Sequence, residues 1–258
     1  MDKLQLEKIH EATLFILDRF GVRVESALAL QLFRDHDIRV DMDSMRVYPS
    51  SQQIDAALKT VPPSFQIYSR TSDIPMTIGD HNHYILSGGG SVRVRTLKGN
   101  YEPASWEHLR QFNTLLDALP HIHILLNQVD PQGDQSSFFY KLIAAEMFAG
   151  TTKPCCLQAG SAEDLNAMIE MGCTIQGSLQ SLQQRPIFFT GSNAEPPLCI
   201  PKHAAEIQMT ASRKYIPCGI GDYAMMGVTS PVTIAGVLAQ RNAVQMVSLL
   251  LSQISQPG

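Results

Sequence analysis

The fold class is indicated by one stretch of the sequence, Lys214-Tyr-Ile-Pro-Cys-Gly-Ile-Gly-Asp-Tyr-Ala-Met-Met-Gly-Val-Thr-Ser-Pro-Val-Thr-Ile-Ala-Gly236. It predicts a buried strand over residues 216–220, then a loop rich in glycine and methionine, then a long apolar helix. Ser230 suits the cap of that helix because its hydroxyl can accept a hydrogen bond from a free backbone amide, and Pro231 suits the first helical position. A strand that ends in glycine and feeds a helix is the repeating unit of α/β folds, which keep their chemistry in the loop between the two.

The same strand–helix unit recurs upstream. Strand starts are expected near Tyr84, Ile122, Pro154, Pro186 and Ile216, at intervals of 30 to 38 residues. A (β/α)8 barrel spends roughly 31 residues on each unit. The longer first interval has a local cause, a β-hairpin predicted over Val92–Tyr101 that turns at Gly99-Asn100. We therefore expect an α/β protein with a TIM barrel of which about five strand–helix units are present. Spacing alone leaves a doubly wound sheet of the flavodoxin type open, since that fold also needs five units.

Two domains are expected. Residues 1–80 predict a helical N-terminal extension with short β pieces, and residues 81–258 predict the partial barrel. The extension contains an amphipathic helix that Gly21 ends, a helix over residues 27–33, β candidates at 39–40, 46–48 and 65–68, and a helix capped by Ser50 or Ser51. In the barrel part, Ser105 and Ser161 are expected to cap two further helices, and a shorter helix is expected over His203–Arg213.

Composition narrows the class of protein. With 44% hydrophobic and 17% charged residues and a net charge of -4, the chain has a globular composition without the basic surface of a nucleic-acid-binding protein. The apolar run over residues 234–251 is interrupted by polar residues, which predicts a buried helix rather than a membrane span. The first residues lack the hydrophobic core of a signal peptide. Five cysteines, odd in number, indicate reduced thiols. We therefore expect a cytoplasmic protein with neither nucleic acid nor membrane as a partner.

Several segments carry a resemblance to a known family. Asp222 to Gly236 resembles the corresponding segment of the trimethylamine methyltransferase family, the corrinoid-dependent methyltransferases. The other matching segments are Leu86-Ser-Gly-Gly-Gly-Ser91, Asp117-Ala-Leu-Pro120, Ala149-Gly-Thr-Thr-Lys-Pro154 and Ile169-Glu-Met171. They occur in the family's order and cover nearly the whole chain. Family members are much longer, and the chain stops at Gly258, about where the sixth barrel strand is expected to begin. The resemblance therefore covers the N-terminal portion of the family.

The resemblance implies a function in methylamine metabolism, including methanogenesis. A methyl group would move from a methylated amine, such as trimethylamine or a betaine, to the cobalt of a corrinoid. The corrinoid (cobalamin) would be presented by a cognate corrinoid protein docking over the barrel mouth, with no cofactor bound directly. In the trimethylamine-specific branch pyrrolysine is the catalytic electrophile, and its position would lie beyond Gly258. The catalytic residues, the branch and the exact substrate are therefore not assigned. Five strands of eight leave unpaired sheet edges, so we expect a homo-oligomer and an inactive isolated chain.

Polar residues at the predicted strand ends form the candidate substrate site. A barrel gathers these positions around one cavity, and aromatic faces and carboxylates suit a quaternary ammonium group. Each residue alone also fits a loop-capping role. The candidate substrate-binding residues are Gly89, Gly90, Gln128, Gln158, Asn193, Glu195, Asp222 and Tyr223, and Asn127, Asp130 and Ser192 lie beside them.

Other reactive residue types are assigned structural roles. His81-Asn-His83 and His121-Ile-His123 have residues that bind metals, but both precede their strands and so belong to the face opposite the site. Lys153 and Lys214 also precede strands and are expected to be solvated caps rather than Schiff-base lysines. Cys155-Cys156 is expected to pack in the core, because adjacent cysteines suit one tetrahedral zinc poorly. No metal site is expected.

Two alternatives stay open on the sequence. A metal-dependent hydrolase on the same barrel would need further ligands after the fourth strand, where only His203 follows. A catalytically inactive fragment or paralogue acting as a binding module is the other.

Overall fold

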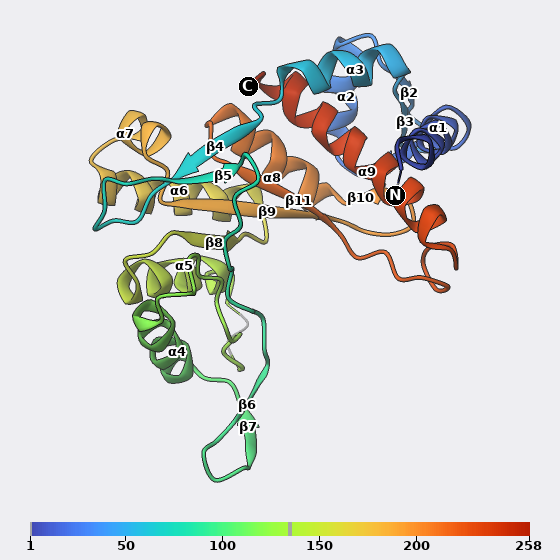
Figure 1. The fold of residues 1–258 in the computed structure, drawn as a ribbon. Helices are drawn as coiled ribbons and strands as arrows, with labels where there is room; N and C mark the ends of the chain where they lie inside the picture. The colour runs from blue at the N-terminus through green and yellow to red at the C-terminus, as the bar shows by residue number, and fades with distance from the viewer. Residues whose placement is uncertain (1, 134–135) are drawn as a thin grey trace. The chain divides into compact units, whose positions relative to one another are not determined.

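The computed structural model describes residues 2–133 and 136–258, and the described chain is a mixed α/β protein (Figure 1). It divides into two compact units. The terminal unit contains residues 1–62 and 191–258, and the central unit contains residues 63–190. The first sixty residues therefore share a core with the last part of the chain. The expected division into residues 1–80 and 81–258 is a different partition and stays a prediction.

The terminal unit begins with the elements predicted for the N-terminal extension. They are α1 (Lys3–Arg19), β1 (Val22–Val24), α2 (Ala27–Asp35), β2 (Arg39–Asp41), β3 (Arg46–Tyr48) and α3 (Ser51–Thr60). Gly21, with a φ of 62°, ends α1, and Ser50 begins α3 with a capping box to Gln53. The sheet order is β10-β1-β3-β2, and β1 pairs antiparallel with β3 and parallel with β10 (Cys199–Ile200).

The C-terminal elements build the core of this unit. They are α8 (Lys202–Arg213), β11 (Cys218–Asp222) and α9 (Ile234–Ser255). α9 lies against α1, α3 and α8, and its Val247 and Leu251 belong to one buried cluster with Leu17, Val47 and Ile54. Burying each such side chain contributes about 1.5–3 kcal/mol. By length and composition alone α9 could also cross a membrane, but eight of its residues are buried in this unit.

The central unit contains two antiparallel pairs and four helices among its described residues. The pairs are β4 (Ser64–Ile67) with β5 (Met76–Gly79) and β6 (Arg93–Arg95) with β7 (Tyr101–Pro103). The helices are α4 (Trp106–Ala118), α5 (Phe139–Gly150), α6 (Ala162–Gln176) and α7 (Leu179–Gln184), and β8 (Cys155–Gln158) lies between α5 and α6. The predicted hairpin is confirmed, as are the caps of α4 and α6 by Ser105 and Ser161.

Some of the strands expected to build a barrel are regular strands, and the others are only isolated bridges. β9 (Phe188–Ala194) passes from the central unit into the terminal unit, and the strand order of its sheet is β11-β9-β8. Parallel bridges between Leu125 and Cys155 and between Leu86 and Ile124 extend this neighbour order toward the N-terminus. No closed barrel occurs among the described residues.

The strands expected at Tyr84 and Ile122 were wrong as regular strands, because the structure has only isolated bridges there. The physical reason is Ser87. Its hydroxyl accepts from the Leu126 amide at 2.9 Å and lies 3.0 Å from the Leu126 carbonyl oxygen, to which it donates. A side chain therefore takes the place of backbone partners in the ladder, and regular pairing stops.

The start expected for the last helix was also wrong. α9 begins at Ile234, and its cap is Thr233, whose hydroxyl accepts from the Gly236 amide. Ser230 makes a turn instead, because its amide and that of Thr229 both donate to the Met225 carbonyl. The loop between β11 and α9 is consequently longer than the sequence indicated.

Candidate functional site

The glycine run of the central unit lies against the segment that follows the second predicted strand. The Gly90 amide donates to the Asn127 carbonyl at 3.0 Å, and the Ser91 amide donates to the Gln128 carbonyl at 3.2 Å. Gly89 approaches so closely that a Cβ there would lie 2.5 Å from Leu126 Cδ2 and 2.9 Å from the Asn127 carbonyl oxygen. Gly89 is therefore required for packing, and Gly90 adopts a φ of 72°, which favours glycine.

Two polar side chains accompany this run. Asn127 is buried, and its amide nitrogen donates to Asp130 at 2.6 Å. Burial raises the pKa of Asp130, and the hydrogen bond from Asn127 only partly opposes that rise. Gln128 lies beside Gly88, with its Nε2 3.4 Å from the position that a Cβ would take. The structure thus brings Gly89, Gly90 and Gln128 together. Gln158 is exposed at the end of β8.

Replacing Gly89 by alanine is expected to lower the free energy of unfolding by about 1–3 kcal/mol, because the new Cβ forces the 86–91 segment away from Leu126 and the Asn127 carbonyl. Chemical denaturation measures the change. Gly191→Ala is the matched control, since a Cβ there meets nothing within 4 Å; its effect should stay within about 1 kcal/mol. Equal stabilities of the two variants would contradict the close approach.

In the terminal unit, Asn193 and Tyr223 form a pair at the ends of β9 and β11. The Asn193 amide nitrogen donates to the Tyr223 hydroxyl oxygen at 2.8 Å. The pair depends on Gly221, because a Cβ there would lie 2.1 Å from Asn193 Oδ1. Tyr223 is 65% exposed, so one ring edge is held while the rest of the ring meets solvent. An aromatic face held in this way can receive a cationic group.

The other two candidate residues of this unit, Glu195 and Asp222, make their hydrogen bonds with residues other than Asn193 and Tyr223. Glu195 is exposed, and its backbone amide and carbonyl pair with those of Cys199 across a turn that contains the cis peptide Pro196-Pro197. Asp222 is the last residue of β11 and directly precedes Tyr223 in the chain. One Asp222 oxygen accepts from the Ala224 amide at 2.7 Å, and the other is buried without a partner.

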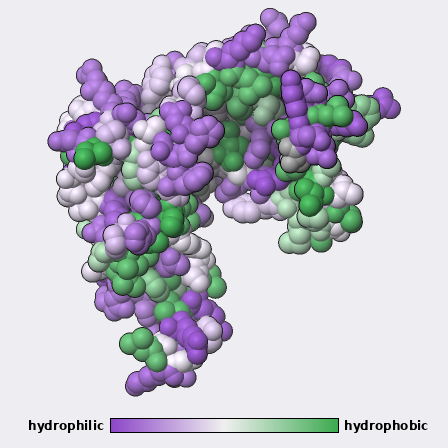
Figure 2. Space-filling model, viewed as in Figure 1, coloured by the Kyte–Doolittle hydropathy of each residue, from purple (hydrophilic) through white to green (hydrophobic). Residues whose placement is uncertain are grey.

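The loop between β11 and α9 exposes an unusual number of apolar side chains. In Figure 2 hydrophobic residues gather where Figure 1 draws this loop. The exposed members are Tyr223, Met225, Met226, Val228, Val232 and Ile234. A contiguous apolar surface of this kind is typical of contact with a ligand or a protein.

The segments around Asp117 and Thr151 interlock in the central unit. The Asp117 carboxylate accepts from the Thr151 hydroxyl and, at 2.9 Å, from the Thr152 amide. Lys153 Nζ donates to the carbonyls of Leu116 and Leu119 at 2.8 and 2.7 Å, at the C-terminal end of α4. A cation at a helix C-terminus is favourable. Lys153 is therefore a partly buried cap of α4 rather than the solvated residue that we expected. We name residues 116–119 with 151–153 the α4 latch.

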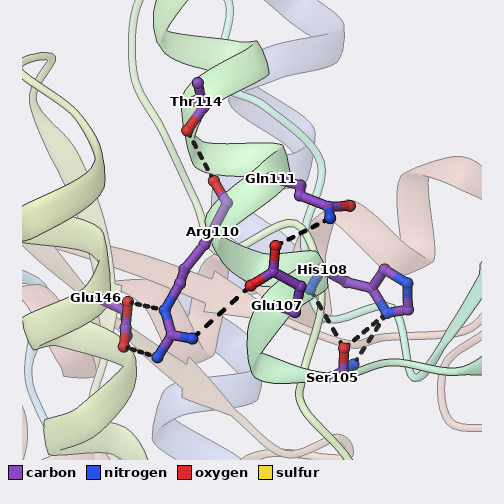
Figure 3. A network of polar contacts seen from close by, with 7 residues as sticks. All are labelled: Ser105, Glu107, His108, Arg110, Gln111, Thr114 and Glu146. Carbon is purple, nitrogen blue, oxygen red and sulfur yellow. Dashed lines mark hydrogen bonds and ion pairs between the residues drawn. The ribbon is translucent and has the colours of Figure 1, made fainter.

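A second polar network joins α4 to α5 (Figure 3). Arg110 donates to both carboxylate oxygens of Glu146, at 3.0 and 2.6 Å, and Glu107 lies 3.9 Å from its guanidinium. Ser105 and His108 form the cap of α4 in the same view. Because every member bonds within the network, it serves the scaffold rather than a ligand.

The remaining reactive residues have structural surroundings. His123 Nδ1 accepts from the Ile85 amide at 3.1 Å, and its ring packs edge-on against Tyr84. Burial raises the pKa of Cys155 and of Cys156 to about 12, so both thiols stay protonated and unreactive at neutral pH. No group of three or more metal-ligating side chains is found in residues 2–133 and 136–258.

Comparison with known proteins identifies the family. The family model described as trimethylamine methyltransferase (MTTB) matches residues 1–258. The chain belongs to the trimethylamine methyltransferase family. It is 25% identical over 255 residues to trimethylamine methyltransferase MttB of Desulfitobacterium hafniense (strain DSM 10664 / DCB-2), covering 98% of this chain and 51% of the relative. It is 24% identical over 255 residues to glycine betaine methyltransferase of Desulfitobacterium hafniense (strain Y51), covering 98% and 53%. It is 24% identical over 269 residues to L-carnitine:corrinoid methyltransferase of Eubacterium limosum, covering 99% and 54%.

The chain thus spans about half the length of the curated relatives that it matches. In this member of the trimethylamine methyltransferase family, the segments that carried the resemblance have distinct places. Residues 86–91 pack on residues 124–130, and residues 117–120 and 149–154 contribute to the α4 latch. Residues 222–236 form the exposed loop and the start of α9. Residues 86–91 and the residues of the α4 latch therefore contact other parts of the scaffold, whereas most of residues 222–236 are exposed.

Ser230 and Arg241 are polar residues whose place the sequence did not reveal. Ser230 looked like a helix cap, but its hydroxyl is buried and unpartnered. Arg241 looked like an interruption of an apolar helix, but its Nε is likewise buried and unpartnered. The only sequence signal was a charged residue in the middle of an apolar run.

Proposed function

We propose that the chain is part of a corrinoid-dependent methyltransferase that removes a methyl group from a methylated amine. The observation that carries the proposal is the Asn193–Tyr223 pair. It offers an exposed aromatic face, fixed by a 2.8 Å hydrogen bond, at the ends of two neighbouring strands. Attraction between such a face and a quaternary ammonium group contributes about 0.5–2 kcal/mol. The curated relatives are named for trimethylamine, glycine betaine and carnitine, which all carry a methylated nitrogen.

The chain's own residues would bind and orient the amine. Asn193 fixes the Tyr223 ring, and its amide donates to the phenol oxygen, so the phenol proton is left for another acceptor. In the central unit, the desolvated Asp130 provides a carboxylate held by Asn127. Gly89, Gly90, Gln128, Gln158, Glu195 and Asp222 stay proposals for substrate binding. Glu195 has the weakest support, because it is exposed and only its backbone is paired.

We propose that the corrinoid arrives on a separate cognate protein and supplies the cobalt that accepts the methyl group. The exposed apolar loop between β11 and α9 supports this proposal, because it offers a docking protein an apolar surface that includes Tyr223. We assign the catalytic role to none of these residues.

We further propose that the neighbour order from Leu86 through β8, β9 and β11 belongs to a (β/α)8 barrel, that the protein is a cytoplasmic homo-oligomer, and that residues 1–258 alone are inactive. The neighbour order supports the first of these, because consecutive strands of a barrel lie side by side.

The test is demethylation of trimethylamine, glycine betaine and carnitine, followed by mass spectrometry of the amine product. Residues 1–258 are compared with the same chain extended by whatever follows Gly258 in the reading frame. Product is expected only with the extended protein and only when a reduced corrinoid protein is added. Product without the corrinoid protein, or no product from any of the three amines, would overturn the proposed function. Activity of residues 1–258 alone would overturn only the proposal that they are inactive.

A further inference from the structure

Helix α1 of the terminal unit has an exposed side that carries both apolar and charged residues. Leu4 and Phe15 are 60% and 62% exposed, and Lys8 and Glu11 lie between them in the chain and are also exposed. Steps of four, three and four residues place these side chains in one stripe along the helix. The side that α1 packs on α9 lies opposite. We name Leu4, Lys8, Glu11 and Phe15 the α1 stripe.

The groups of the α1 stripe are open to a further contact. Its two charged residues make no ion pair within residues 2–133 and 136–258, whereas Lys3 of the same helix pairs with Glu7 at 3.7 Å. The Phe15 ring meets the Phe20 ring edge-on, with centroids 6.3 Å apart, and Phe20 is itself 52% exposed. The stripe therefore offers an apolar group at each end and a cation and an anion between them.

The order of these groups is self-complementary. Residues 4 and 15 have the same midpoint as residues 8 and 11, between Ile9 and His10. One twofold axis through that midpoint, perpendicular to the helix, therefore brings both pairs together in an antiparallel contact between two copies. In a parallel contact the two Lys8 side chains would face each other, as would the two Glu11 side chains, and like charges repel. The charges thus favour the antiparallel arrangement.

We propose that the α1 stripe is the contact surface of a dimer in which the α1 helices of two copies pack antiparallel. Leu4 of one copy contacts Phe15 of the other, and Lys8 of one copy pairs with Glu11 of the other. Each pair occurs twice because the interface is symmetric. Burial of the apolar groups provides the attraction, and the charges set direction and register.

This surface gives a location to the homo-oligomer of the proposed function, and it rests on that part of the proposal alone. A contact between two single helices is small beside the ~1,200–2,000 Å² that a stable interface buries. We therefore expect a dimer that dissociates reversibly at micromolar concentrations.

The test is sedimentation velocity of the 258-residue chain over a series of concentrations, which gives the dissociation constant of the dimer. Phe15→Ser removes an apolar group from both symmetric contacts and should raise that constant at least about tenfold. Leu97→Ser is the matched control, because Leu97 is a fully exposed apolar residue on the β6–β7 hairpin. It should leave the dissociation constant unchanged.

Charge reversal tests the antiparallel register. Lys8→Glu and Glu11→Lys should each raise the dissociation constant about fivefold, because each variant places like charges opposite each other at two symmetric positions. The double variant Lys8→Glu/Glu11→Lys should return it to within about twofold of the unmodified value, since opposite charges then meet again.

Four results would count against the α1 stripe as a dimer surface. The first is a chain that stays monomeric at every concentration. The second is unchanged association of a folded Phe15→Ser variant, and the third is a double reversal as weak as either single reversal. The fourth is dimerisation of residues 1–258 that is lost in the chain extended past Gly258, which would assign the stripe to the following segment.

Circular dichroism shows whether each variant is folded, and the charge variants decide if Phe15→Ser is not. Association that none of these variants changes would remove the α1 stripe but leave the homo-oligomer. Demethylation is a separate readout, so the proposed methyl transfer stands or falls independently of this surface.

Discussion

Replacing Tyr223 by alanine in the active, full-length protein is expected to lower kcat/KM for demethylation about 30-fold. The ring is 65% exposed but held by Asn193, so it presents a fixed aromatic face to a methylated ammonium group. Once the bound amine and the docked corrinoid protein exclude water from the ring, a contact of that kind is worth about 2 kcal/mol, which is about 30-fold in rate. The assay is the amine-product measurement with a saturating amount of reduced corrinoid protein.

Tyr223→Phe separates the ring from its hydroxyl. It keeps the aromatic face and loses only the bond from Asn193, so its kcat/KM should fall less than about tenfold. Tyr101→Ala, which removes an exposed tyrosine on the β6–β7 hairpin, is the control and should change little. A Tyr223→Ala enzyme with the activity of the unmodified protein would remove this residue from the substrate site.

Replacing Asp117 by alanine is expected to lower the free energy of unfolding by about 2–3 kcal/mol. The substitution removes the acceptor for the Thr151 hydroxyl and the Thr152 amide, and Thr151 is buried. A buried donor left without a partner costs about 1–3 kcal/mol, and hydrogen bonds to a charged group lie at the upper end. Asp117 stands in the last turn of α4, where a carboxylate is otherwise unfavourable, so these bonds account for its presence.

The effect of Asp117 has a defined pH dependence. Burial by itself raises the pKa of Asp117, but the hydrogen bonds from Thr151 and Thr152, aided by the charge of Lys153, bring it below its ordinary value of 3.8. A carboxylate whose pKa is lowered on folding stabilises the folded state above its unfolded pKa and loses that effect as the pH falls through the folded pKa. The stability difference between the unmodified protein and Asp117→Ala should be full at pH 7 and shrink below about pH 3.8.

Chemical denaturation across this range measures the difference. Asp55→Ala is the matched control, because Asp55 is also a helical aspartate but is exposed on α3. It should change the free energy of unfolding little at any pH. A difference for Asp117→Ala that does not change between pH 7 and pH 3 would contradict the role given to its charged form.

Local patterns predicted most helices and several small strands of this protein. Ser50, Ser105 and Ser161 cap the helices expected from them, since a cap depends on residues three positions apart. The hairpin at Gly99-Asn100 followed for the same reason. Ser230 shows where local reasoning fails. Its hydroxyl suits a cap, but the Met225 carbonyl captures its amide in a turn, and Thr233 takes its place.

The sequence by itself determined the α/β class, the caps of α3, α4 and α6, the family, and the polar residues at the ends of β8, β9 and β11. Only the tertiary structure decided how those residues group. It paired Asn193 with Tyr223 through the space left by Gly221, and it left one buried polar atom of each of Asp222, Ser230 and Arg241 without a partner. It also packed the first sixty residues on α9. The physical reason is the range of the interactions: caps and turns act within four residues, whereas burial and pairing depend on segments far apart in the chain.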